Sequence, residues 1–184
     1  VKGVYYVFDE KARRLSPAKK SVVKVKNISY FVDTKGRAVK GWNEYKNKMY
    51  YSYSNGKCAV NTKIDGIKFN KNGAADLTQA REMLEAKKFI AAHTTENMNN
   101  YQKLRACFNY VKKNYTYYTW REFTYKPNWE KDFAEDMFFR NGRGDCFSYA
   151  AAFAYLAGAV GMKNVYVISS GGHGWTEING KVYD

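Results

Sequence analysis

The sequence is poor in the residues that build disulfide frameworks and metal sites. Its 184 residues include three cysteines, two histidines and two prolines. A small, odd number of cysteines in a chain of this length does not make a disulfide scaffold. No group of Cys and His has the spacing of a zinc site, and the sequence lacks a glycine-rich phosphate loop and an EF-hand pattern. We therefore expect no metal and no cofactor.

Long apolar segments are missing too. The sequence has no run of about 20 apolar residues, the length that a membrane-spanning helix needs, so we predict no membrane span. It also has no signal peptide. Because the chain starts at Val1 rather than at methionine, and stops directly after a predicted strand, we expect it to be a fragment of a longer protein.

Acidic residues are scarce in the first part of the chain. Residues 1–76 hold 17 Lys and Arg against 6 Asp and Glu, a net charge of +11, whereas the remainder holds 14 against 11, a net charge of +3. This shift predicts two domains, residues 1–76 and 77–184. A basic segment can bind nucleic acid, but no helix-turn-helix, zinc or RNP pattern accompanies the charge, so we do not expect that partner. Another anionic polymer would use the same electrostatics, and a solvated basic face with no specific partner is the alternative.

Aromatic residues and glycines recur within residues 1–76. Tyr30-Phe31 with Gly36 and Tyr50-Tyr51 with Gly56 repeat at a period of 20 residues. Phe69 with Gly73 follows after a shorter interval, and Tyr5-Tyr6-Val7-Phe8 is an earlier, decayed copy. Each unit predicts a short aromatic strand, a turn and a second strand, which is too small to bury its own face. Neighbouring units must therefore stack, which predicts an N-terminal β-hairpin repeat module.

The repeats resemble a known family of binding modules. Lys40-Gly41-Trp42 and the segment from Tyr50 to Lys57 are similar to the G-W and Y-Y-x-x-x-x-G patterns of the cell-wall-binding and choline-binding repeats of Gram-positive surface proteins. The resemblance implies a secreted, wall-associated protein that binds a cell-wall glycan, choline or an anionic wall polymer through aromatic stacking and cation–π contacts. Alternatively, the aromatic residues only hold a thin β array together. The candidate wall-binding residues are Trp42, Tyr50, Tyr51, Tyr30 and Phe31.

A cysteine opens the most apolar segment of the chain. Cys146 follows Gly144-Asp145 and precedes a near-continuous apolar run from Phe147 to Val160, which ends at Gly161. The run is too long for a strand, so it predicts a buried helix with Cys146 in its first turn. There the unpaired N–H groups and the helix dipole favour a thiolate, the form of cysteine that attacks carbonyls. Cys107, on the apolar stripe of another predicted helix, is interpreted as a core residue.

A histidine and an aspartate flank a strong turn signal downstream. Asn179-Gly180 predicts a β-hairpin with a two-residue type I′ turn. In that register His173, Trp175 and Asp184 share one face, and His173 and Asp184 are diagonal neighbours. A thiol, an imidazole and a carboxylate in the order Cys146, His173, Asp184 predict a nucleophilic triad.

In this order the motifs resemble the transglutaminase-like superfamily, whose core reads as a G-x-C helix, a short strand, an H-x-W strand and an aspartate on the next strand. The resemblance covers about residues 77–184. It implies an α+β fold with a papain-like core, in which the cysteine helix packs on a small antiparallel sheet. It also implies that Cys146 is the nucleophile, His173 the general base and acid, and Asp184 the orienting carboxylate. A residue two positions beyond Asp184 would share its face, so a later carboxylate remains an alternative.

The resemblance further implies a cysteine enzyme acting on a protein or peptide substrate. Its thiolate would attack an amide or peptide carbonyl and form a thioester, which water resolves in a protease or amidase and a primary amine in a transglutaminase. Hydrolysis is favoured, because amine transfer needs a site that excludes water. The alternative of another class is a non-catalytic surface-binding protein with an inactive transglutaminase-like domain.

The residues between the repeats and the cysteine predict helices. Apolar periodicity indicates amphipathic helices over Asp76–Ile90 and around Tyr101–Val111, and a third helix over Trp129–Phe138. A buried strand is expected at Val165–Ile168. The aromatic segment from Asn114 to Trp120 could form a substrate wall or supply an oxyanion-hole donor, but we favour packing between helix and sheet. The N–H of the nucleophilic cysteine can supply one such donor, and the sequence does not identify a second.

Overall fold

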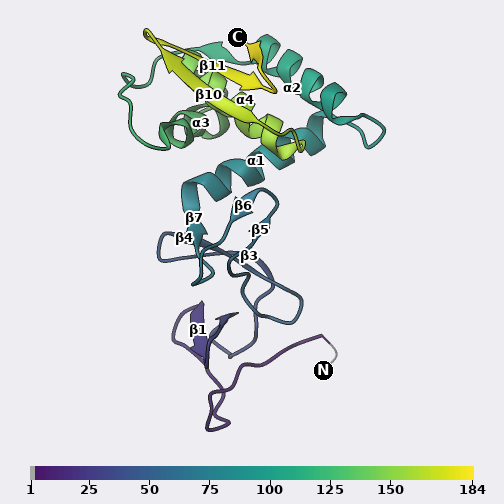
Figure 1. Ribbon diagram of the computed structural model, residues 1–184. Coiled ribbons are helices and arrows are strands. Elements are labelled where there is room, and N and C mark those ends of the chain that lie inside the picture. Colours follow the sequence, from purple (N-terminus) through teal and green to yellow (C-terminus); the bar gives the residue numbers. More distant parts are fainter. Residues whose placement is uncertain (1–2) are drawn as a thin grey trace. The chain divides into compact units, whose positions relative to one another are not determined.

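The computed structural model describes residues 3–184 and divides into two compact units, one ending at Ala80 and the other running from Arg81 to Asp184. The chain mixes helices with small, mainly antiparallel sheets, as the α+β prediction requires. Figure 1 labels the elements of both units. Each unit has its own secondary structure and is described by itself below.

The first unit is built from short hairpins. Its strands are β1 (Ser21–Val25), β2 (Ile28–Val32), β3 (Gly41–Tyr45), β4 (Lys48–Ser52), β5 (Lys63–Ile64), β6 (Ile67–Lys68) and β7 (Ala75–Asp76). Strands β1–β2, β3–β4 and β5–β6 pair antiparallel as hairpins, and β7 adds to β4. The β3–β4 turn has φ values of 47° at Lys46 and 56° at Asn47, the left-handed pair that a type I′ turn needs.

One turn recurs at the positions where the sequence repeats glycine. After β2, the Gly36 N–H donates to the Asp33 carbonyl at 3.0 Å, and after β4 the Gly56 N–H donates to the Tyr53 carbonyl at 2.9 Å. A Cβ on Gly56 would lie 2.4 Å from the Ala38 Cβ of the preceding unit, so the repeat requires glycine there. Successive units also hydrogen-bond, with the Cys58 N–H donating to the Ser29 carbonyl at 2.8 Å.

The second unit combines helices with two small sheets. Helix α1 (Leu77–His93) spans the division between the units, and α2 (Asn100–Asn114), β8 (Thr116–Tyr117), α3 (Trp129–Phe139), β9 (Arg143–Gly144) and α4 (Cys146–Ala159) follow. Strands β10 (Val165–Ser170), β11 (His173–Ile178) and β12 (Lys181–Tyr183) complete the chain. Asn99 caps α2 in a capping box with Gln102, which fixes where that helix begins.

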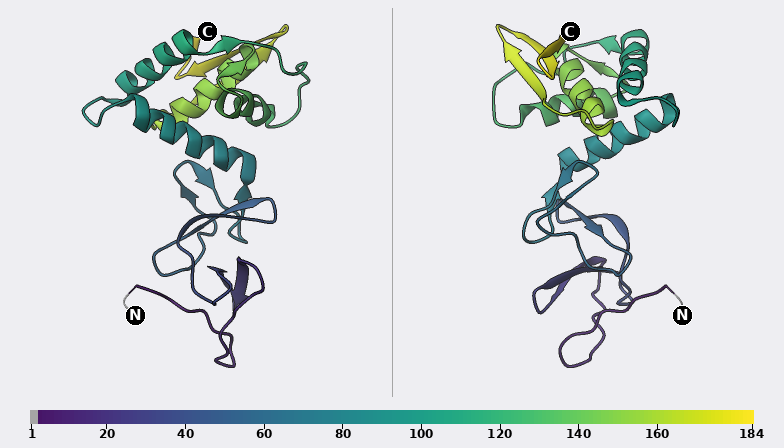
Figure 2. Two further views of the ribbon diagram at one scale, coloured as in Figure 1. Left: turned by 180° about the vertical axis from the view of Figure 1, so that it is seen from behind. Right: turned by 45° about the vertical axis from the view of Figure 1, so that its right-hand side comes forward.

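The C-terminal sheet has the predicted hairpin. Strands β10, β11 and β12 are antiparallel in that order, and Thr176 pairs with Tyr183. The connecting residues Asn179 and Gly180 have φ values of 52° and 75°, as a type I′ turn requires. Helix α4 contacts β10 and β11 as well as α3, and these elements lie together in all the views (Figures 1 and 2).

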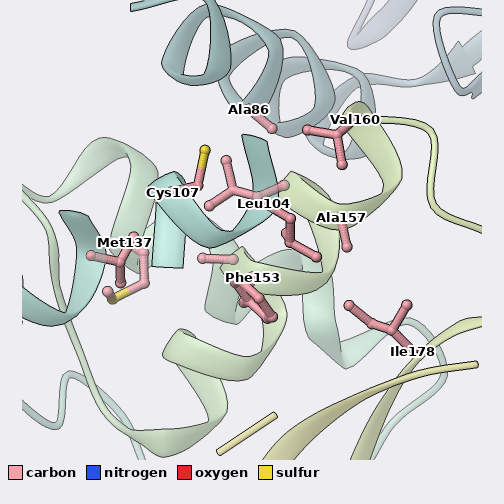
Figure 3. Packing of buried hydrophobic residues seen from close by; sticks show 11 residues of the cluster. Ala86, Leu104, Cys107, Met137, Phe153, Ala157, Val160 and Ile178 are labelled. Carbon is pink, nitrogen blue, oxygen red and sulfur yellow. The ribbon is translucent and has the colours of Figure 1, made fainter. Parts of the chain in front are cut away.

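A buried cluster of the second unit gathers side chains of α1, α2, α3, α4 and β11 (Figure 3). Leu104 and Cys107 of α2 pack near Leu156 of α4 and Ile178 of β11, and all four are at most 2% exposed. Burial raises the pKa of the Cys107 thiol to about 11. The interpretation of Cys107 as a core residue is therefore confirmed.

Candidate active site

The sequence around Cys146 is shaped to start a helix. Asp145 is the N-cap of α4, and its carboxylate accepts hydrogen bonds from the Ser148 N–H at 3.1 Å and the Ser148 hydroxyl at 3.2 Å. A Cβ on Gly144 would lie 2.3 Å from the Ser148 Cβ and 2.5 Å from the Met137 sulfur, so only glycine fits there. Cys146 is the first residue of α4 and is half-buried, whereas Cys58 and Cys107 are buried.

His173 and Asp184 are joined by a direct contact. The Nε2 atom of His173 lies 3.0 Å from Oδ1 and 2.9 Å from Oδ2 of Asp184. Because Nε2 faces the carboxylate, Nδ1 is the ring nitrogen left for another partner. The indole of Trp175 stacks on the imidazole with ring centroids 6.1 Å apart, so the three residues share one face as the sequence predicts.

Gly174 lets the histidine strand approach the cysteine helix. A Cβ at this position would lie 2.7 Å from Cδ1 and 3.1 Å from Cα of Phe147, the residue after Cys146. The Thr176 hydroxyl donates to the Ala150 carbonyl at 2.7 Å, which ties β11 to α4 two residues further along the strand. The glycine of the His173-Gly174-Trp175 motif is therefore required by packing beside the cysteine.

Cys146, His173 and Asp184 all line one cavity of about 360 Å³. Most of its wall is apolar, and one cation, the side chain of Lys112, lines it as well. The structure thus brings the three residues of the predicted triad to a single cavity. The other aromatic side chains on the wall come from α2, β8, α4, β11 and β12, and are Phe108, Tyr117, Tyr149, Phe153, Trp175 and Tyr183.

Tyr117 is a cavity residue that the sequence did not single out. It lies in the aromatic segment from Asn114 to Trp120, for which packing was favoured, yet it is 64% exposed and lines the cavity beside Cys146. Partial burial raises the pKa of its phenol. The Cys146 thiol and the charges of Cys146 and Asp145 raise this pKa further, whereas the Cys146 N–H lowers it. Tyr115, in the same segment, does pack against the core, as was favoured for this segment.

The candidate wall-binding residues of the first unit divide into two groups. Phe31 is fully buried and packs against Tyr45 and Tyr50, so its ring offers no surface to a ligand and its assignment as a binding residue is corrected. Trp42 is half-buried between Tyr51 and Phe69, with ring centroids 5.0 and 5.8 Å away. The aromatic contacts of Trp42 and Tyr51 hold the hairpins together.

Tyr30 lines a second cavity, of about 230 Å³, within the first unit. Tyr5, Tyr6 and Phe8 share this wall, and each of the three is between 44% and 51% exposed. Lys57 also lines the cavity. The decayed first copy of the repeat thus supplies exposed aromatic rings that the sequence did not identify as binding candidates.

Residues 3–184 hold no group of three or more His, Cys, Asp or Glu side chains that could bind a metal ion. None of the helices in this part of the chain has the length and apolar character to span a membrane.

Comparison with protein families assigns the C-terminal part of the chain. The family model of the transglutaminase-like superfamily matches residues 87–182, which are 96 of the 184 residues. The chain therefore belongs to the transglutaminase-like superfamily. No curated protein matches it.

Solved structures of choline-binding proteins match part of the chain. The choline binding domain of Spr1274 from Streptococcus pneumoniae is 28% identical over 41% of this chain and 87% of that domain, with a TM-score of 0.34. Choline binding protein F from Streptococcus pneumoniae is 26% identical over 41% of this chain, also with a TM-score of 0.34. The chain spans 24% of the length of that protein.

Proposed function

We propose that the second unit is a cysteine acyl-transfer enzyme in which Cys146, His173 and Asp184 form a catalytic triad. The observation that carries the proposal is the contact of 2.9–3.0 Å between His173 Nε2 and the Asp184 carboxylate, at a cavity that Cys146 also lines. With α4 packed on β10 and β11, we further propose a papain-like arrangement of this core.

The chemistry follows from the roles of the three groups. Nδ1 of His173 accepts the thiol proton of Cys146, and the thiolate attacks the carbonyl carbon of an amide or peptide bond. The Asp184 carboxylate stabilises the imidazolium and fixes its orientation. The tetrahedral intermediate collapses when the C–N bond breaks and the imidazolium protonates the departing amine, which leaves a thioester on Cys146. Water or a primary amine then resolves this thioester.

Hydrolysis is the outcome that the site favours. Transfer to an amine competes with water, so it needs a site from which water is excluded. The His173 and Asp184 side chains are 47% and 59% exposed, so water has direct access to the base that would activate it. We therefore propose a protease or amidase acting on a protein or peptide, with amine transfer as the second possibility.

The first unit is proposed to hold the enzyme at a Gram-positive cell wall, which makes the protein a secreted one. The support is the cavity formed by Tyr5, Tyr6, Phe8 and Tyr30, because exposed aromatic rings bind sugars and quaternary ammonium groups by stacking and cation–π contacts. The net charge of +11 over residues 1–76 would add attraction to anionic wall polymers.

Selective alkylation tests the catalytic proposal. At pH 6, iodoacetamide should label Cys146 faster than it labels a free small-molecule thiol, because an imidazolium and a helix N-terminus favour the thiolate. Labelling of Cys58 and Cys107 should be slow, since burial raises the pKa of both thiols and keeps them protonated. Peptide mass spectrometry identifies the labelled residue.

Two substitutions sharpen this test. Cys146→Ala should abolish the fast labelling, whereas Cys107→Ala should leave it unchanged and lower the free energy of unfolding by about 1 to 2 kcal/mol through a small core cavity. Equally slow labelling of all three cysteines would contradict the proposal and favour a non-catalytic surface-binding protein.

A further inference from the structure

We propose that the Tyr117 hydroxyl is the second donor of the oxyanion hole, acting together with the backbone N–H of Cys146. This inference rests on the proposed acyl-transfer function, because the negative oxygen to be stabilised arises only when the thiolate adds to a carbonyl. The hydroxyl donates a hydrogen bond to that oxygen and keeps its proton throughout.

Strand pairing fixes Tyr117 next to the start of α4. Strand β8 runs parallel to β9, with Tyr117 opposite Gly144, which lies two residues before Cys146. The Tyr118 N–H donates to the Gly144 carbonyl at 2.9 Å, and the Thr116 N–H donates to the Gly142 carbonyl at 2.9 Å. These two bonds flank Tyr117, so its backbone is held in register with the loop that carries the nucleophile.

Side chains reinforce the same connection. The indole N–H of Trp120 donates to the Arg143 carbonyl at 2.7 Å. The Arg143 guanidinium lies over the Tyr118 ring, 4.4 Å from its centroid, and 5.7 Å from that of Trp120. The segment after Tyr117 is therefore attached to the residues before Cys146 by backbone and side chain, and this preorganises the phenol.

The phenol lines the same cavity as the reacting group. Its ring stacks on Tyr149, one turn of α4 beyond Cys146, with centroids 6.5 Å apart and an interplanar angle of 17°. Tyr117 and Cys146 line the same cavity. A carbonyl oxygen bound to the attacked carbon must lie in this cavity, beside the Cys146 thiol and its backbone N–H. The raised pKa of the phenol keeps it protonated at neutral pH, so its O–H is available to donate.

Two other donors on the cavity wall are already engaged. The indole N–H of Trp175 donates to the Glu177 carboxylate at 3.1 Å, and the Thr176 hydroxyl donates to the Ala150 carbonyl at 2.7 Å. A donor that is committed to another acceptor would have to lose that bond in order to stabilise an oxyanion.

Two reactions of Cys146 distinguish an oxyanion donor from other roles. Acetylation by p-nitrophenyl acetate passes through a tetrahedral oxyanion, whereas alkylation by iodoacetamide does not. Removing one oxyanion-hole donor typically lowers the rate by about 10²- to 10³-fold. Tyr117→Phe should therefore slow acetylation of Cys146 by at least about ten-fold, even with this reactive ester, while its alkylation rate stays within about two-fold of the wild type. Tyr118→Phe, the matched control on the neighbouring residue, should change neither rate.

The other outcomes overturn the inference in recognisable ways. If the rates of acetylation and alkylation fall by the same factor in Tyr117→Phe, the phenol acts on the thiol rather than on the oxyanion. Faster acetylation would mean that the phenol blocks the place of the substrate oxygen. If the acetylation rate is unchanged in Tyr117→Phe and wild-type Cys146 is acetylated, Tyr117 is not an oxyanion donor. The triad proposal is then unaffected. If wild-type Cys146 is not acetylated at all, both the triad proposal and the oxyanion-donor proposal are contradicted.

Discussion

At the scale of single residues, the three cysteines show how position decides chemistry. Cys107 is fully buried and Cys58 is 6% exposed, and burial raises the pKa of both thiols. Cys146 is half-buried at the first position of α4 and opens onto a cavity with a histidine. The thiol is therefore an unreactive core group at positions 58 and 107 and a candidate nucleophile at position 146.

Asp184 gives a prediction at this scale. Asp184→Asn should keep the hairpin, because residue 184 lies beyond the last paired residue of β12. The amide cannot stabilise the imidazolium and favours the wrong tautomer, which in a comparable triad costs about 10⁴-fold. Acetylation of Cys146 by p-nitrophenyl acetate should fall by orders of magnitude, with an unchanged circular dichroism spectrum. If a chain extended past residue 184 keeps full activity with this change, a later carboxylate orients His173.

At the scale of elements, the site depends on how closely β11 approaches α4. Gly174 allows this approach, because a Cβ there would lie 2.7 Å from Cδ1 of Phe147. Gly144 instead lets the residues before α4 pack against Ser148 and Met137, which a Cβ would approach to 2.3 and 2.5 Å. The contacts of α4 with α3 and with β11 place the cysteine and the histidine at one cavity. The elements of the second unit therefore position the reactive groups through backbone proximity as well as through side chains.

Gly174→Ala tests this dependence. The added methyl group must displace Phe147 or the strand, so His173 should move relative to Cys146, at a stability cost of about 1 to 3 kcal/mol. We expect slower acetylation and a lower melting temperature. Gly158→Ala is the matched control, because its methyl group would meet only the Met83 Cε, at an ordinary 3.5 Å. Full activity of Gly174→Ala at wild-type stability would contradict the requirement for close approach.

At the scale of the whole molecule, a basic repeat module precedes a transglutaminase-like domain in one chain. The repeats bury Phe31 and Phe69 and leave aromatic rings of the first copy exposed. If the first unit binds a cell wall as proposed, its charge and its aromatic surface are two separate contributions to that binding. Retention on purified Gram-positive walls at different salt concentrations separates the two contributions.

The double variant Tyr5→Ser, Phe8→Ser should weaken retention on purified walls at every salt concentration, because aromatic contacts are poorly screened by ions. A polycation would instead be eluted as the screening length falls from about 10 Å at 0.1 M to about 3 Å at 1 M salt. Tyr125→Ser, at a residue of the second unit that is 72% exposed, is the control. Elution by salt alone, with the double variant behaving as the parent does, would contradict an aromatic binding surface.

Local signals in the sequence were enough to predict much of the fold and of the candidate site. The apolar run after Cys146 indicated α4, and Asn179-Gly180 indicated the hairpin that aligns His173 with Asp184, because helix periodicity and turn type depend on neighbouring residues. The repeat of aromatic residues and glycines likewise corresponds to hairpins and turns that recur in the structure.

Tertiary packing decided which side chains are buried and which distant segments pair, and local sequence signals do not specify either. Phe31 and Tyr30 are adjacent in the sequence, yet one ring is buried and the other lines a cavity, because only contacts between successive hairpins determine which side is covered. The strand expected to be buried at Val165–Ile168 carries Tyr166 at 57% exposure. Tyr117 reached Cys146 through a parallel pairing of β8 with β9. Such a pairing joins residues far apart in the chain and has no local sequence signal.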